Sequence, residues 1–350
     1  MIRSYQGIRV IAMLIIFFYH CVSLMNEGLF LKIYSNLFYD GQFAVILFFM
    51  LSGVVTYLSL SKTTKIYEVK EYIFYVLKKI KKIYPVYILS LFLGIILSEN
   101  FFKSFKGAIT IIIDLLCLQS YIPNPQIYFS YNGVLWFISS LTFCYLIANP
   151  IYNFISEINV KRSCLMVVII LIIELILELI FKNYSIYQWL IYINPGIRAI
   201  QFIIGMNMAN ILKSIRINNL NIKIFSLLEI ISIIFLGIVY IFSRYLPAET
   251  RCGVYYIPNL ISILFIFYFE KGIISRILSN RILKKIASFS MEFYMIHQMI
   301  IIAYSRYINK NSLFSVTFCL LLSLVIAFVV HDYIIKFNNY KGRLKLKRGI

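Results

Sequence analysis

The sequence predicts an all-α fold, a polytopic membrane helix bundle of about ten transmembrane helices with one further re-entrant or interfacial helix. The chain has 350 residues, is 61% hydrophobic and only 14% charged, and has a mean hydropathy of +0.85, which excludes a soluble globular domain. Ten apolar segments approach the roughly 20 residues that a helix needs to cross a bilayer. They are 8–26, 41–60, 83–98, 134–151, 164–181, 190–212, 224–243, 254–270, 288–307 and 313–335.

An eleventh apolar segment, 107–121, is short, contains Asp114 and is followed by a loop with two prolines. If it does not cross and the N-terminus is cytoplasmic, most of the 34 Lys and Arg residues fall in cytoplasmic segments. If it crosses, every later loop moves to the opposite side of the membrane, and the basic tail faces outside. The positive-inside rule therefore favours a re-entrant or interfacial helix on the outer side, both termini in the cytoplasm, and a multi-pass location in the cell (cytoplasmic) membrane.

The formal net charge of +20 would suggest a nucleic-acid partner in a soluble protein, but cytoplasmic loops explain it here. We therefore expect no nucleic-acid partner. We expect the basic tail to contact anionic membrane lipids. No repeat or linker divides the chain, so we expect one transmembrane domain, 1–336, and a basic cytoplasmic tail, 337–350. The scattered cysteines have no metal-ligand spacing, and we predict no metal site.

Arg9 and His20 are two ionisable residues in one long apolar run, the first predicted span. Eleven helical steps separate them, so their side chains lie within about 20° of each other and roughly 16 Å apart along the axis. Ionisable groups in a membrane usually face a polar cavity or the bundle interior. The alternative is a snorkelling arginine and a histidine that bonds to a neighbouring helix.

Four lysines lie at the cytoplasmic entrance of the third span, Lys78, Lys79, Lys81 and Lys82. Lys78/Lys81 and Lys79/Lys82 are i,i+3 pairs, so each pair can present two cations on one side of a helix. Such pairs suit a ligand with several phosphates, which lysine binds as a point charge. An anchor at lipid headgroups is at least as good an interpretation of these residues alone.

Three further stretches carry polar groups or an aromatic anchor in or beside apolar spans. His297 and Gln298 lie in the ninth span and need a polar environment. Trp136 opens the fourth span, where an interfacial belt residue is the simpler interpretation. Glu174 and Glu178 share a face of the fifth span. They either make helix–helix contacts or form part of a proton path.

Together and in this order, these stretches resemble the acyltransferase-3 family of integral-membrane O-acyltransferases over nearly the whole chain. The segments that carry the resemblance are 6–20, with its Arg-x10-His spacing, 41–53, 78–87, 135–137, the weaker 195–205, and 286–298. The chain departs from the family pattern in two places. Lysines replace the usual arginines of the basic-x-x-basic motif, and Gln6 stands where an acidic residue is common.

The resemblance implies that the donor is acyl-coenzyme A, which carries an acetyl or another short acyl group and binds from the cytoplasm. It implies no permanently bound cofactor. It implies an acceptor hydroxyl on a cell-envelope or exported polysaccharide or its lipid-linked precursor. His20 would be the general base, since neutral histidine can take a hydroxyl proton near pH 7. Arg9 would complete the catalytic pair.

The other site residues follow from the same resemblance. Arg9 and the four lysines would bind the coenzyme A phosphates. Trp136, His297 and Gln298 would line the cavity, with His297 as a second polar group or proton shuttle. A transporter or flippase of a lipid-linked glycan is the leading alternative, since it also needs intramembrane polar groups. A structural subunit is disfavoured, because it has no need of such groups in apolar spans.

Overall fold

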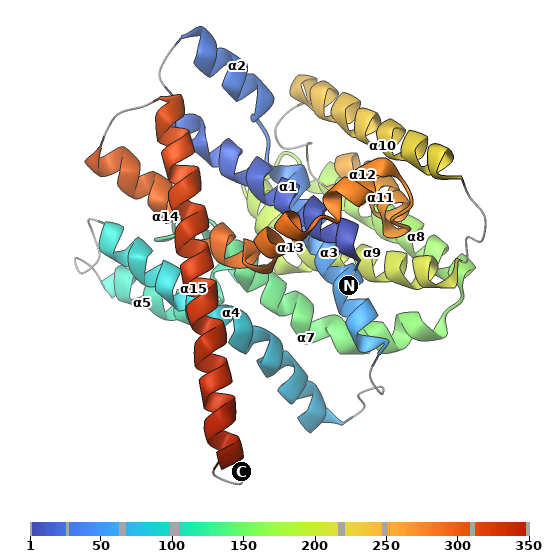
Figure 1. The fold of residues 1–350 in the computed structure, drawn as a ribbon, viewed down its shortest axis with the longest axis horizontal. Helices are drawn as coiled ribbons and strands as arrows, with labels where there is room; N and C mark the ends of the chain where they lie inside the picture. The colour runs from blue at the N-terminus through green and yellow to red at the C-terminus, as the bar shows by residue number, and fades with distance from the viewer. Residues whose placement is uncertain are drawn as a thin grey trace.

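The computed structural model describes residues 2–25, 28–62, 68–98, 105–215, 221–246, 251, 253–308 and 312–347. Within these ranges the regular elements are all helical, which confirms the all-α prediction (Figure 1). The helices are α1 (Arg3–His20), α2 (Leu29–Leu37), α3 (Gln42–Leu60), α4 (Val69–Leu97), α5 (Phe105–Leu115), α6 (Pro125–Tyr128), α7 (Trp136–Glu157), α8 (Val160–Phe181), α9 (Pro195–Ser214), α10 (Ile222–Phe242), α11 (Gly253–Tyr268), α12 (Ile273–Leu278), α13 (Arg281–Ser288), α14 (Ser290–Tyr307) and α15 (Leu313–Lys347). Short helical turns add η1 (Cys21–Leu24), η2 (Gln119–Tyr121), η3 (Trp189–Ile193) and η4 (Ser243–Tyr245).

Each of the ten predicted spans falls on one helix of this bundle. Among the described residues, seven helices are long and apolar enough to cross a membrane, or eight if the bent pair α13–α14 forms one span. The remaining two predicted spans, α9 and α11, miss this test for identifiable reasons. α11 has 16 residues, and α9 carries buried polar side chains on a helix that neighbouring helices enclose.

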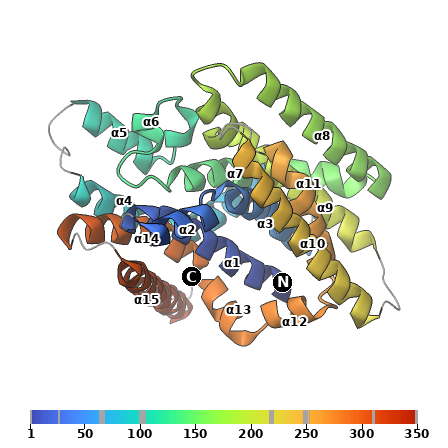
Figure 2. The same cartoon turned by 90° about the horizontal axis from the view of Figure 1, so that it is seen from above.

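The eleventh apolar segment forms α5, which has 11 residues. Such a helix extends about 16 Å, roughly half of the hydrocarbon thickness of a bilayer, so α5 is too short to cross. The chain turns back through η2 and α6 before α7 begins, and Figure 2 shows α5 and α6 side by side at the edge of the bundle. This geometry agrees with a re-entrant or interfacial helix.

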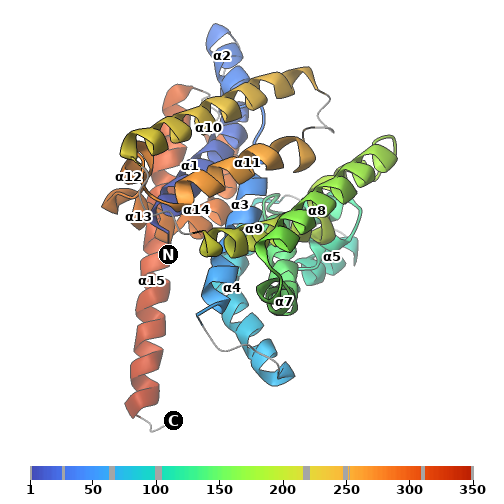
Figure 3. The same cartoon turned by 90° about the vertical axis from the view of Figure 1, so that its right-hand side faces the viewer.

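One end of the bundle is marked by charge. α4 begins at Val69, well before the predicted span, because the lysine-rich stretch is itself helical. In Figures 1 and 3 the N-terminal half of α4 and the C-terminal half of α15 extend in the same direction beyond the other helices. We call this side, with Lys78–Lys82 and Lys336, the basic end. Of the residues used to predict orientation, some lie outside the described residues: Lys65, Lys103, Arg216, Lys310 and Arg348.

α3 and α9 cross backbone to backbone inside the bundle. A Cβ atom on Gly53 of α3 would fall onto the carbonyl of Phe202, and one on Gly205 of α9 would fall onto the carbonyl of Met50. Two glycines that face each other's helix in this way allow an approach that no other residue permits. The contact fixes α3 and α9, which both carry residues of the site described below.

We expect Gly53→Val to destabilise the fold, because the added side chain must push α9 away from α3. Overpacking of this kind costs about 1–3 kcal/mol or more. Gly237→Ala in α10 is the matched control, since nothing lies within 4 Å of a Cβ at that position. Thermal unfolding of the purified proteins measures the difference. A Gly53→Val protein as stable as Gly237→Ala would contradict the close crossing.

Candidate active site

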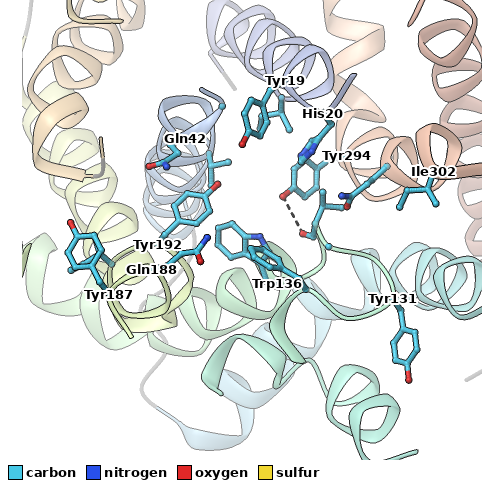
Figure 4. A pocket seen from close by; sticks show the side chains of 18 residues that line it. Tyr19, His20, Gln42, Tyr131, Trp136, Tyr187, Gln188, Tyr192, Tyr294 and Ile302 are labelled. Atoms are coloured by element: carbon cyan, nitrogen blue, oxygen red, sulfur yellow. Dashed lines mark hydrogen bonds between the residues drawn. The ribbon is translucent and has the colours of Figure 1, made fainter. Parts of the chain in front are cut away.

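A pocket of about 640 Å³ lies where the C-terminal end of α1 meets the N-terminal ends of α3 and α7. The chain around η3 and the middle of α14 close its other sides, as Figure 4 shows. His20, Trp136 and Gln298, three of the residues predicted from the sequence, line it. The N-terminal end of α3 lies at the pocket, and its C-terminal end leads in sequence to the lysine-rich α4 of the basic end.

His20 and His297 lie in contact, with ring centroids 5.3 Å apart. His20 is half-buried at the pocket, whereas His297 lies behind it and is only 1% exposed. Nδ1 of His297 is 2.7 Å from the carbonyl oxygen of Tyr294, which can only accept, so Nδ1 carries the proton. Nε2 is thereby left as an acceptor, buried and without a hydrogen-bond partner among the described residues.

The turn before α3 forms part of the pocket wall. The carboxylate of Asp40 accepts a hydrogen bond of 2.7 Å from the backbone N–H of Gln42 and another of 2.7 Å from the hydroxyl of Tyr256. A carboxylate is favourable at a helix N-terminus, where backbone N–H groups have no partner within the helix. A Cβ on Gly41 would lie 3.3 Å from the Tyr19 ring, so glycine leaves room for that ring at the pocket wall.

Arg9 lies in the N-terminal half of α1, about 16 Å along the helix axis from His20. Its guanidinium interacts electrostatically with Tyr145 of α7 and with Glu292 of α14. The ammonium of Lys79 lies 5.6 Å from the centroid of the same Tyr145 ring and 5.4 Å from that of Tyr75. Tyr145 therefore interacts with both Arg9 and Lys79.

The other three lysines of the cluster point elsewhere. Lys79 is half-buried, whereas Lys78, Lys81 and Lys82 are exposed. The structure thus brings one lysine of the four to Tyr145, with which Arg9 also interacts, and leaves the others on the surface of the basic end, where lipid headgroups or solvent can surround them.

Glu292 and His331 form a pair that the sequence did not reveal. Nδ1 of His331 on α15 lies 2.7 Å from the carboxylate of Glu292 on α14, and the two side chains are 20% and 13% exposed. Asp332, the sequence neighbour of His331, instead pairs with Lys336 one turn later. The available signal was that Glu292 and His331 are ionisable residues in apolar helices, which usually pair. The sequence cannot show which partner each one has.

Arg198 of α9 supports the pocket wall from behind. It is fully buried, and its Nε donates a 2.6 Å hydrogen bond to the carbonyl of Tyr192. Its Cζ lies 4.7 Å from the Tyr192 ring centroid and 5.7 Å from that of Trp136. Nη1 donates to Gln201, whose amide donates in turn to Glu174 at 3.2 Å. Glu174 therefore serves a helix–helix contact, and Trp136 is 3% exposed rather than a belt residue at the lipid.

Asp114 of α5 is buried against the loop that leads to α7 and the pocket. Ser130 Oγ lies 2.6 Å from its carboxylate and 2.6 Å from the carbonyl of Ile127, but one hydroxyl hydrogen can serve only one of them. A protonated Asp114 donates to Ser130 and leaves Ser130 free to donate to Ile127. Burial raises the pKa of Asp114 from an ordinary 3.8 to about 7, and the hydrogen bond from Ser130 opposes part of the shift.

We expect this loop to lose stability as the pH rises. Because the Asp114 pKa is higher in the folded protein, the bound proton contributes stability at low pH, and this contribution is lost as the pH rises through about 7. Asp114→Asn keeps a donor toward Ser130 and does not titrate. The unfolding midpoint should therefore fall more between about pH 5.5 and 8.5 in the wild type than in this variant. Equal pH dependence of the two proteins would contradict the expectation.

Comparison with known proteins adds one match. The sequence matches the acyltransferase-3 family, described as an acyltransferase domain, over residues 2–332. No curated protein and no solved structure matches the chain. The matched region contains every predicted site residue, the contact between His20 and His297, and the spans that make the chain a multi-pass membrane protein. The chain therefore belongs to the acyltransferase-3 family and is a membrane acyltransferase.

Proposed function

We propose that this protein moves an acyl group, acetyl or another short acyl, from acyl-coenzyme A to a hydroxyl of a cell-envelope or exported polysaccharide or its lipid-linked precursor. One observation carries the proposal. A single helix, α1, holds in its N-terminal half Arg9, which interacts with Tyr145 as Lys79 does, and at its C-terminal end His20, whose ring contacts that of His297. Phosphate-binding cations and a general base are thus about 16 Å apart on one helix.

The donor binds from the basic end. Arg9 and Lys79 supply the positive charge that the coenzyme A phosphates need, and Arg9 can also offer a planar fork of N–H donors. The long pantetheine arm then extends along α1 and carries the thioester toward His20. The basic end also supports a cytoplasmic position for both termini and a location in the cytoplasmic membrane, since positive loops are retained in the cytoplasm.

His20 takes the proton of the acceptor hydroxyl as its oxygen attacks the thioester carbonyl carbon. The C–O bond forms, the C–S bond breaks, and coenzyme A leaves as a thiolate. The proton passes from His20 to this thiolate, so the products are an O-acyl ester and free coenzyme A. His297, with its protonated Nδ1 held by the Tyr294 carbonyl and a second ring nitrogen that can accept, contacts the His20 ring and supports it during the transfer.

The test uses the full chain in nanodiscs with radiolabelled acetyl-coenzyme A and membrane glycans from the expressing cells. We expect saturable binding of acetyl-coenzyme A, release of free coenzyme A and label in the glycan fraction as an alkali-labile ester. A transporter or flippase would move the glycan without binding the thioester. Absence of both binding and release, with acetyl and longer acyl donors, would contradict the proposed function.

A further inference from the structure

The pocket combines a small volume with walls that carry no formal charge. Its volume of about 640 Å³ lies in the range of small-molecule sites. None of its described lining residues is Lys, Arg, Asp or Glu. The polar groups come instead from His20, tyrosine hydroxyls and glutamine amides. Such a lining suits an uncharged ligand with hydroxyl groups.

A rigid aromatic wall forms one side of the pocket. The ring centroids of Trp136 and Tyr192 lie 4.9 Å apart, and the Arg198 guanidinium behind them contacts both rings. Because Arg198 also holds the Tyr192 carbonyl, the wall is positioned before a ligand arrives. The face of an aromatic ring carries partial negative charge and matches the C–H groups of a sugar ring. Figure 4 shows Trp136 and Tyr192 at the pocket.

Gln298 offers an unused acceptor beside the histidine pair. It follows His297 on α14 and lines the pocket, and its Oε1 is buried with no hydrogen-bond partner among the described residues. A Cβ on Gly133 would lie 3.3 Å from its amide, so this glycine lets the loop before α7 close over it. A buried acceptor without a partner is costly, and a ligand O–H group satisfies it. Gln42 and Gln188 present amides from other sides (Figure 4).

An anionic ligand finds no counter-charge here. Arg198, the nearest cation to the aromatic wall, is fully buried behind it, and its guanidinium donates to Tyr192, Gln201 and Ile191. A carboxylate in the pocket would lose its hydration without gaining a cation, which is costly.

We infer that the pocket is the acceptor site for an uncharged sugar ring. The ring stacks on Tyr192, which is half-buried and which the buried Trp136 supports from behind, the hydroxyl to be acylated lies at His20, and Gln298 accepts a hydrogen bond from the neighbouring hydroxyl. Gln298 is thus a residue that determines specificity. The inference rests on the proposed function for the identity of the reacting hydroxyl, but the sugar binding it describes needs neither a donor nor turnover.

The chain contains two tryptophans, so Trp189→Phe leaves Trp136 as the sole tryptophan of the full-length protein. We would titrate this protein in nanodiscs, without acyl-coenzyme A, with methyl glycosides of glucose, galactose, mannose and N-acetylglucosamine. Methyl glucuronoside and methyl galacturonoside are the matched anionic probes. We expect a saturable change of Trp136 fluorescence with at least one neutral glycoside, and at least tenfold weaker binding of its uronate.

Gln298→Leu tests the specificity role, with Gln126→Leu as the control because Gln126 is exposed and outside the pocket. Both variants are made in the Trp189→Phe protein. Because Gln298→Leu removes one hydrogen bond, it should weaken the binding of the preferred glycoside by about five- to tenfold. The affinity for epimers that place this hydroxyl differently should change less than twofold in Gln298→Leu. A general distortion of the pocket would weaken all of them alike, so the loss of preference separates the two cases.

Three results would overturn the inference: no neutral glycoside changes Trp136 fluorescence, uronates bind as tightly as their neutral counterparts, or Gln298→Leu leaves the preference intact. The proposed function fails by a different result. If neutral sugars bind and no acyl group is transferred, the sugar site stands and the acyltransferase proposal does not.

Discussion

His20→Ala is expected to lower kcat for acyl transfer by about 100- to 10,000-fold, the range in which a positioned general base contributes. The KM for acyl-coenzyme A should change little, because the proposed phosphate ligands, Arg9 and Lys79, are remote from His20 along α1. His20→Gln should lose almost as much, since an amide can hold the hydroxyl but cannot take its proton. Steady-state kinetics at varied donor concentration measures both quantities.

His297 provides the control for this result. His297→Asn can keep a donor near the Tyr294 carbonyl while it removes the ring and its acceptor nitrogen from contact with the His20 ring. We expect a loss of kcat that is smaller than that of His20→Ala. If His297→Asn lost more activity than His20→Ala, with both proteins folded, the general base would be His297, and the assignment of His20 would be wrong.

Arg9→Gln is expected to raise the KM for acyl-coenzyme A by about 10- to 100-fold, because hydrogen bonds to a charged group contribute about 1.5–3 kcal/mol. Arg9→Lys keeps the charge and loses the planar fork, so its effect should be intermediate. Lys79→Ala should raise the same KM by about tenfold, since it removes a half-buried cation next to Tyr145.

Lys81→Ala is the matched comparison for Lys79→Ala, because Lys81 belongs to the same basic stretch but is exposed. An exposed cation contributes little to binding in water, so we expect less than a twofold change in KM. Binding of acetyl-coenzyme A to the purified variants, measured by calorimetry, checks this order. Equal losses for both lysines would mean that the whole stretch, rather than Lys79, binds the donor.

The sequence predicted the bundle well because its signal is the period and length of apolar runs. All ten predicted spans fall on helices, and 107–121 contains a helix too short to cross. Apolarity is less informative about where the helices begin and what surrounds them. α4 extends N-terminally of the predicted span 83–98, because the charged stretch before it is helical too, and α9 carries buried polar side chains, because other helices surround it.

The site was harder to predict because partners far apart in sequence decide it. The spacing of Arg9 and His20 on one helix face could be calculated, and that spacing led to both residues. The choice of Lys79 among four lysines depends on Tyr145, which reaches it from another helix. The pairing of Glu292 with His331 likewise depends on how α14 packs on α15. No local pattern contains these contacts.

The central claim is that His20 performs the transfer of an acyl group from coenzyme A to a glycan hydroxyl. The most direct test is a parallel measurement of labelled acetyl entering membrane glycans for wild type and His20→Ala at saturating acetyl-coenzyme A. We expect label in the wild-type glycan and at least about 100-fold less in the variant, with equal binding of acetyl-coenzyme A by the two proteins. Equal incorporation by both proteins would contradict the claim.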